Sequence, residues 1–322
     1  MEETAPISVD DVERAREAIG GRLHRTPTFT SATLSELTGA DVHLKAELFQ
    51  RTGSFKPRGV LNKLASLSAE EKARGLIGIS AGNHAQALAY VAALEELDAL
   101  VVMWSDASEQ KVEAARGYGA TVDLEAPDKT EAFTRLAELI EETGRTLVHP
   151  FDDPVVQAGQ GTVGLELLAD VEADVVVVPI GGGGLIAGIS TAVKGRRPEA
   201  RVIGVEPVSS SAMHSALVAG EPVTVEADSI ADGLNAPFAG PNALEVVRER
   251  VDDVVLVTEA EIEDGFRFLY RRAKLACEPA GAASTAALLA GKIAFEQGER
   301  VALVVSGGNV DPKTASAILA SR

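Results

Sequence analysis

The sequence predicts an α/β fold built of two open parallel-sheet lobes that share a cleft. Short runs rich in β-branched residues alternate with stretches of helical spacing, the alternation occurs in two series, and no long linker separates them. A chain of 322 residues with 46% apolar residues can bury cores of this size. Because ligands of open α/β sheets bind beyond the carboxyl ends of the strands, we look for chemistry in the turns that follow them.

The first series predicts a small α/β domain of residues 69–149. Each expected strand is followed by a stretch with helical spacing, which is the pattern of parallel strands joined by crossover helices. The expected strands are Leu76–Ile79, Ala99–Met103, Thr121–Leu124 and Thr146–Val148.

The second series predicts a large domain formed by residues 1–68 and 150–322. Its runs are nearly all apolar, as expected for strands covered on both faces. A first helix is expected after Ser8, because Asp11 stands three residues further on and the two can form a capping box. The expected strands are Val42–Glu47, Val175–Val178, Arg201–Val205, Val254–Val257 and Val301–Val305.

The charge of the chain restricts its partners. It has 30 basic and 48 acidic residues, a formal net charge of −18, and so offers no long-range attraction to nucleic acid. The same charge would suit a protein kept in solution at high salt, an alternative that the sequence leaves open. The single cysteine, Cys277, excludes an intrachain disulfide and is expected to be a small buried hydrophobe.

Two stretches bear on location. The uncharged run Val175–Val193 approaches the ~20 residues that span a bilayer, but Pro179 and five glycines divide it into a strand, a turn and a helix start. Residues Met1–Asp10 are acidic and lack the apolar stretch of a signal peptide. We therefore expect a cytoplasmic protein that does not enter a membrane.

The strongest local signal is the turn Gly181-Gly182-Gly183-Gly184, between the strand that ends at Val178 and a helix that starts near Leu185. Without side chains, its backbone amides can close on an anion at the positive end of the helix, so we expect a phosphate. The turn does not identify the cofactor, because Gly182-x-Gly184-x-x-Ala187 also satisfies the dinucleotide fingerprint and Glu206 ends the next strand. A nicotinamide enzyme is a competing interpretation.

A second turn is also ambiguous. Gly78-Ile79-Ser80-Ala81-Gly82 matches the G-x-S-x-G elbow of serine hydrolases, and His149 or His214 could serve as the base. Neither histidine stands in an obvious base-presenting turn, so the hydrolase interpretation is the weaker one.

Two further turns offer a lysine and a hydroxyl. Lys56 lies in Thr52–Gly59 at the start of a helix that runs to about Leu67. A helix start lowers the pKa of a lysine and favours the free amine, the form that attacks an aldehyde. Ser306-Gly307-Gly308-Asn309 follows the last buried strand and offers its hydroxyl to the cleft.

Together these segments resemble the fold-type II pyridoxal-phosphate enzymes, specifically the threonine dehydratase and serine racemase group. Order and spacing agree from about Arg25 to the C-terminus. The matching segments are Ser54–Gly59, Ser80–Ala87, the four glycines and Ser306–Asn309, supported by Pro150–Asp153, Ala158–Thr162, Ala231–Gly233 and Glu278–Gly281.

The resemblance implies a cofactor, pyridoxal 5′-phosphate, held between the two lobes, and a role for each turn. Lys56 would bind the cofactor covalently and act as the catalytic base, Phe55 would pack beside the ring, and Asn83 would bond its 3′-oxygen. The phosphate would rest on Gly181, Gly182, Gly183, Gly184 and Leu185, and Ser306 would meet the pyridine nitrogen. The substrate carboxylate would be bound by Ser80, Ala81, Gly82, Asn83 and His84.

The implied reaction is β-elimination on L-threonine or L-serine, which yields a 2-oxo acid and ammonia. Alternatives are a dehydratase of another β-hydroxy amino acid such as hydroxyaspartate, a serine racemase, and a non-catalytic protein that binds the cofactor or an amino acid. The resemblance also implies a homodimer and, because the chain ends soon after the Ser306 turn, no C-terminal regulatory domain.

The sequence departs from the group at three places. Racemases carry a serine where this chain has Ala81, which favours elimination because a methyl group cannot transfer a proton. The cation site of racemase-like members would need an acid at Ala212 beside Glu206, so no metal is expected. Trp104 replaces part of a proline-bearing segment and either packs in the small lobe or narrows the entrance.

Overall fold

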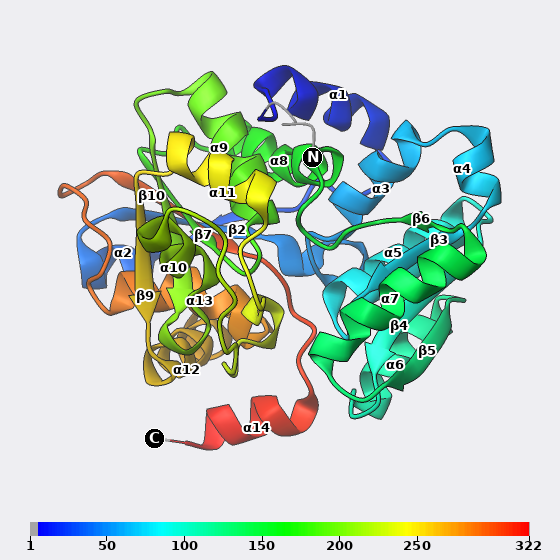
Figure 1. Cartoon of the computed structure of the whole chain (residues 1–322). Helices are drawn as coiled ribbons and strands as arrows, with labels where there is room; N and C mark the ends of the chain where they lie inside the picture. Colours follow the sequence, from blue (N-terminus) through cyan, green and yellow to red (C-terminus); the bar gives the residue numbers. More distant parts are fainter. Residues whose placement is uncertain (1–5, 322) are drawn as a thin grey trace.

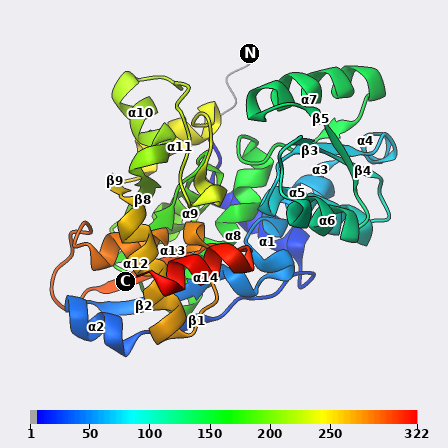
Figure 2. The same cartoon turned by 90° about the horizontal axis from the view of Figure 1, so that it is seen from below.

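The computed structural model describes residues 6–321, which form two lobes, each built on a mainly parallel sheet (Figure 1). Viewed from below, the lobes stand side by side, with the small lobe at the upper right (Figure 2). Residues 1–5 and 322, which belong to the predicted large domain, lie outside the described residues, as does the first half of the stretch Met1–Asp10. The fold class predicted from the sequence is confirmed.

The small lobe holds a four-stranded parallel sheet in the order β5-β4-β3-β6. Along β3, Leu76 packs into one apolar cluster with α5 and α6, whereas Ile77 packs into another with α7, so both faces are covered. The four predicted strands are confirmed within two residues at each end. The elements are α4 (Ala69–Ala73), β3 (Leu76–Ile79), α5 (Asn83–Leu94), β4 (Ala99–Trp104), α6 (Glu109–Gly117), β5 (Thr121–Ala126), α7 (Lys129–Thr143) and β6 (Thr146–Leu147).

The large lobe holds a six-stranded sheet in the order β1-β2-β10-β7-β8-β9. The five predicted strands are confirmed, but β1 (Thr28–Thr30) was not predicted and pairs antiparallel with β2. Its three residues are partly or fully exposed and carry no apolar run, so the pattern gave no signal there. The other strands are β2 (Asp41–Ala46), β7 (Val175–Pro179), β8 (Arg201–Pro207), β9 (Asp253–Val257) and β10 (Arg300–Val305).

Two helices of the large lobe begin at capping boxes. Ser8 and Asp11 form the predicted capping box of α1, and Thr258 with Glu261 forms another at α12. The helices are α1 (Val9–Ile19), α2 (Ala32–Thr38), α3 (Pro57–Ser66), α8 (Pro154–Asp170), α9 (Gly184–Arg196), α10 (Ala212–Ala219), α11 (Pro241–Arg250), α12 (Glu259–Phe268), α13 (Pro279–Leu289) and α14 (Pro312–Ala320). Cys277 is buried, as predicted, and burial raises the pKa of its thiol.

The strand order places the ligand-binding turns of both lobes. In the small sheet, β4 and β5 extend to one side of β3 and β6 lies on the other; in the large sheet, β8 and β9 extend to one side of β7 and β10 lies on the other. The connections that leave these neighbouring strands therefore run to opposite sides of the sheet, between β3 and β6 in the small lobe and between β7 and β10 in the large lobe. A crevice opens at such switch points, beyond the carboxyl ends of the strands.

Helix α8 packs closely against the two helices that follow the predicted binding turns, and its glycines permit this approach. A Cβ at Gly159 would lie 2.6 Å from the carbonyl oxygen of Arg58 in α3. A Cβ at Gly188 in α9 would lie 2.2 Å from the carbonyl oxygen of Gln157 in α8. The matched segment Ala158–Thr162 is thus explained by packing: it fixes the Lys56 turn relative to the glycine turn.

The run Val175–Val193 forms β7, a turn and most of α9, as predicted. Of the helices that the structure describes, none is long and apolar enough to cross a bilayer. The small sheet lies within residues 76–147, and the division into residues 69–149 and residues 1–68 with 150–322 stays a prediction.

Candidate active site

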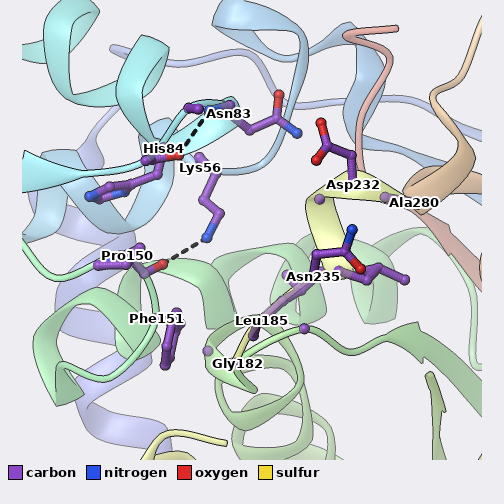
Figure 3. Close-up of a pocket in the computed structure, with 18 of the residues that line it drawn as sticks. Lys56, Asn83, His84, Pro150, Phe151, Gly182, Leu185, Asp232, Asn235 and Ala280 are labelled. Atoms are coloured by element: carbon purple, nitrogen blue, oxygen red, sulfur yellow. Dashed lines mark hydrogen bonds between the residues drawn. The ribbon is translucent and has the colours of Figure 1, made fainter. Parts of the chain in front are cut away.

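One pocket between the lobes collects every residue predicted for the site. Its walls come from the turns after β3, β6 and β7, from the Lys56 turn, and from Asp232, Asn235 and Ala280 (Figure 3). The turn after β10 also lines it, through Ser306 and Asn309. The predicted residues that line it are Phe55, Lys56, Ser80, Ala81, Gly82, Asn83, His84, Gly181, Gly182, Gly183, Gly184, Leu185 and Ser306. The roles that the resemblance gives them remain predictions.

Lys56 lies at the N-terminus of α3, with its side chain in the pocket. Nζ donates a hydrogen bond of 2.7 Å to the carbonyl oxygen of Pro150 and lies 5.1 Å from the centre of the Phe55 ring. Burial lowers the pKa of Lys56 to about 8, and Glu278 offsets this only in part. The lysine is therefore poised to lose its proton near neutral pH, which a nucleophile or base requires.

The Lys56 turn is attached to the turn after β10. Phe55 N donates to Ser306 O at 3.2 Å, and Ser54 pairs with Gly307 in an isolated antiparallel bridge. Ser306 is 4% exposed, and its hydroxyl forms no hydrogen bond with another described residue. The structure thus leaves that hydroxyl available to a ligand of the pocket.

The glycine turn offers unpaired donors at the start of α9. Among residues 6–321, no protein group accepts a hydrogen bond from the backbone N–H groups of Gly181 to Leu185, and no side chain caps the helix. A Cβ at Gly182 would lie 2.3 Å from the Phe151 ring, and Gly183 has a φ of +97°. Positions 182 and 183 therefore require glycine, and the turn presents free amides at the positive end of a helix dipole.

The loop Ser80–His84 forms a second uncapped helix start, at α5. The Ser80 hydroxyl accepts from Gly82 N at 3.0 Å, and Ser80 N donates to Val102 O at 3.2 Å. Two of the five amides are therefore used within the protein. Those of Ala81, Asn83 and His84 have no acceptor among the described residues, and they can bind a carboxylate.

These donors fit pyridoxal phosphate. A partly buried amine of lowered pKa suits its aldehyde, five free amides at a helix start suit its phosphate, and an unbonded hydroxyl suits its ring nitrogen.

Glu278 is a site residue to which the sequence analysis gave no role. It lies directly before α13, lines the pocket, is 7% exposed and accepts a hydrogen bond of 2.7 Å from Asn83 Nδ2. Burial raises its pKa to about 7, although the bond from Asn83 opposes this. The signal in the sequence was an acidic residue between the apolar stretch Leu275–Cys277 and Pro279.

The histidines do not form a hydrolase site. His149 Nδ1 accepts from Asp152 N at 2.8 Å, and His84 Nε2 lies 2.8 Å from Val148 O. Burial lowers the pKa of His84 to about 3 and that of His149 to about 4, so both are neutral. No described histidine bonds the Ser80 hydroxyl, which is occupied by Gly82 N.

Glu206 caps a helix instead of serving a ribose or a cation. Its two carboxylate oxygens accept from Met213 N and His214 N, each at 2.8 Å, at the start of α10. The dinucleotide interpretation of this acid is wrong, because both oxygens are used. Among the described residues, no group of three His, Cys, Asp or Glu side chains could hold a metal ion.

Residues of both lobes meet at the mouth of the pocket. Lys111 from α6 pairs with Asp232, and Lys129 lies 5.5 Å from the centre of the Trp104 ring. The Phe133 ring of the small lobe lies 5.8 Å from that of Phe238 in the large lobe. Trp104 packs into the apolar clusters of the small lobe and also lines the pocket, so both of its predicted roles have a contact.

Comparisons with known proteins agree on a family. The profile described as "Pyridoxal-phosphate dependent enzyme" matches residues 20–307. The chain is 45% identical over 318 residues to "L-threonine dehydratase catabolic TdcB" of Staphylococcus aureus (strain N315), which covers 97% of this chain and 92% of that protein. It is 44% identical over 307 residues to "L-threonine ammonia-lyase" of Thermotoga maritima, with 95% and 76% covered.

A solved structure shows the same fold. The structure of maize serine racemase superposes with a TM-score of 0.93 at 35% identity and covers 97% of both chains. Because similar proteins carry dehydratase and racemase names, the reaction has to be argued from the residues of this pocket.

Proposed function

The chain belongs to the family of pyridoxal-phosphate-dependent enzymes, and from that premise we propose that it converts L-threonine or L-serine by β-elimination into a 2-oxo acid and ammonia. The observation that carries the proposal is the position of the Lys56 amine in one pocket with the free amides of the glycine turn. Relatives at 44–45% identity are named for this reaction on threonine.

Each turn has one task in this proposal. Gly181 to Leu185 would hold the phosphate, Ser306 would meet the ring nitrogen, Phe55 would pack beside the ring, and Asn83 would bond the 3′-oxygen; all of these residues line the pocket. When bound, pyridoxal phosphate supplies an aldehyde for amines and a conjugated ring that stabilises negative charge at the substrate Cα.

Lys56 moves the proton. Its Nζ takes the Cα proton of the amino acid, because a pKa of about 8 leaves part of the amine uncharged near neutral pH. The amides of Ala81, Asn83 and His84 orient the substrate carboxylate, with the Ser80 hydroxyl fixing the loop through Gly82 N. The aromatic contacts of Phe133, Phe238 and Phe151 limit access of water at the mouth.

Racemisation is the alternative that the fold allows, and Ala81 disfavours it. Ala81 is 5% exposed and lines the pocket, and its methyl group cannot return a proton to Cα on the face opposite Lys56. Hydroxyaspartate is a second candidate substrate, since Lys129 lines the pocket and could bind a further carboxylate.

We further propose a homodimer in the cytoplasm. The homodimer rests on the family resemblance, and the location rests on the single buried thiol, which suits a reducing compartment. Sedimentation at several protein concentrations tests the dimer.

One experiment tests the reaction. The purified protein, loaded with pyridoxal phosphate, is titrated with L-threonine, L-serine, D-serine and hydroxyaspartate while absorbance and released 2-oxo acid are followed. We expect turnover of L-threonine or L-serine, no D-serine from L-serine, and loss of both turnover and the visible cofactor band in Lys56→Ala. Retention of either property by Lys56→Ala, or D-serine formation by the wild type, contradicts the proposal.

A further inference from the structure

We propose that Glu278 is a positioning residue that acts through Asn83: together with Asn309 it fixes the Asn83 side-chain amide with its NH2 group available to the cofactor. This inference rests on the function proposed above and concerns a residue to which no role has been given. The argument uses a chain of hydrogen bonds that begins at a backbone carbonyl and ends at Glu278.

A side-chain amide has two nearly equivalent orientations, one presenting oxygen and the other nitrogen, and its neighbours decide between them. The carbonyl oxygen of Thr52 can only accept, so the Asn309 atom 2.6 Å away must be its nitrogen. The same nitrogen donates its other hydrogen at 2.7 Å to Asn83, whose atom there must be oxygen. Asn83 therefore turns its nitrogen to the opposite side.

Glu278 receives that nitrogen. Its Oε1 accepts from Asn83 Nδ2 at 2.7 Å, and this bond uses one of the two hydrogens of the amide. The second hydrogen remains for a ligand, and both residues line the pocket. A phenolic oxygen, which accepts hydrogen bonds, is the group on the cofactor that suits this donor.

The carboxyl group of Glu278 is itself held in place. Glu278 N donates to Gly307 O at 3.0 Å, and a Cβ at position 307 would lie 2.3 Å from Glu278 Oε1. The group is buried, so water cannot easily replace it as the acceptor. Glu278 thus links the turn after β10 to the start of α5, across the two lobes.

An alternative role for Glu278 is purely electrostatic, since Lys56 and Lys111 favour its charged form. The two roles differ in what they require of Asn83. A positioning role disappears when Asn83 is removed, whereas a charge effect on Lys56 persists. A double-mutant cycle separates them.

The experiment measures pyridoxal-phosphate dissociation constants and absorption spectra for the wild type, Asn83→Ala, Glu278→Ala and the double variant. We expect Glu278→Ala to raise the dissociation constant roughly tenfold and to shift the visible band, as Asn83→Ala does. The double variant should be no worse than Asn83→Ala alone. The matched control Glu278→Gln keeps the acceptor without the charge and should stay within about threefold of the wild type.

Effects of Glu278→Ala and Asn83→Ala that add, or a Glu278→Gln variant as weak as Glu278→Ala, overturn the positioning role. If Glu278→Ala does not fold, Asn309→Ala tests the same chain from an exposed position and should weaken cofactor binding several-fold. An unchanged constant in Asn309→Ala contradicts the proposal. A wild type that binds no cofactor refutes the proposed function itself, whereas a wild type that binds it with unaffected variants refutes only this inference.

Discussion

Two basic residues, Lys56 and Arg58, stand two positions apart, the first partly buried and the second fully buried, and their surroundings have opposite effects on their charges. Arg58 Nε and Nη2 donate to the two oxygens of Glu47 at 2.8 and 2.9 Å, and Nη1 and Nη2 donate to Glu166 at 2.7 and 2.9 Å. Burial disfavours its charge, but Glu47 and Glu166 outweigh this and raise its pKa above the ordinary value. Lys56 has one neutral acceptor, Pro150 O, and its pKa falls.

The difference shows how one short segment separates structure from chemistry. The buried cluster of Lys45, Glu47, Arg58 and Glu166 balances two positive with two negative charges, and it ties α3 to η1 (Glu47–Phe49) and α8. A lysine left without a carboxylate partner at the start of the same helix retains a reactive amine. The compensated cluster fixes the position from which the uncompensated lysine works.

The largest expected effect on stability comes from breaking the compensated cluster. Arg58→Met removes the partner of Glu47, which is fully buried, and should lower the free energy of unfolding by about 3–5 kcal/mol. Urea unfolding of the cofactor-free protein measures it. Arg58→Lys keeps the charge but loses the bidentate bonds, so its free energy of unfolding should lie between those of the wild type and Arg58→Met.

An exposed pair provides the control for Arg58. Arg14 pairs with Asp11 on the surface of α1, with the Arg14 side chain 67% exposed, and Arg14→Met should cost less than about 1 kcal/mol. Equal losses in Arg58→Met and Arg14→Met would show that burial does not set the value of these pairs.

The next largest effect has the opposite sign. The pKa of Lys56 lies near 8 in the folded protein, against 10.5 unperturbed. Below pH 8 the lysine is charged in both the folded and the unfolded protein, so the folded protein is destabilised by the full free-energy cost of burying that charge. That cost is roughly 3 kcal/mol, and the lost bond to Pro150 O subtracts about 1. Lys56→Met should therefore stabilise the cofactor-free protein by about 1–2 kcal/mol at pH 7 while abolishing turnover.

The advantage of Lys56→Met should shrink as pH rises from 8 to 10.5, because the folded wild type has then lost the proton that the unfolded chain still carries. The control is Lys45, which is fully buried, whereas Lys56 is only partly buried; Lys45 bonds Glu166 Oε2 and Thr26 O, both at 2.8 Å. Lys45→Met should be destabilising at every pH in this range. A loss of stability in Lys56→Met at pH 7 would show that the charge of Lys56, like that of Lys45, does not destabilise the folded protein.

The residues of the Lys56 pocket could be predicted from the sequence, whereas the partners of Arg58 could not. Glycine turns, the lysine turn and apolar strands are local patterns, so the pocket residues and nearly all strands could be identified from sequence. The partners of Arg58 lie 11 and 108 residues away, and Asn83 meets Glu278 at a separation of 195. Such pairings depend on how the lobes pack, and short elements such as β1 carry no periodicity to detect.

The smallest effect is expected at the mouth of the pocket, where Lys111 pairs with Asp232. This ion pair also joins the lobes, but its side chains are 34% and 57% exposed. Water therefore screens the attraction between them, whereas the charges of the Arg58 cluster are shielded from water. Asp232→Asn should change the free energy of unfolding by less than about 1 kcal/mol, and the change should vanish at roughly 1 M salt. Urea unfolding at low and high salt measures both. A loss as large as that of Arg58→Met, insensitive to salt, would mean that joining two lobes, rather than exclusion of water, determines what an ion pair contributes in this protein.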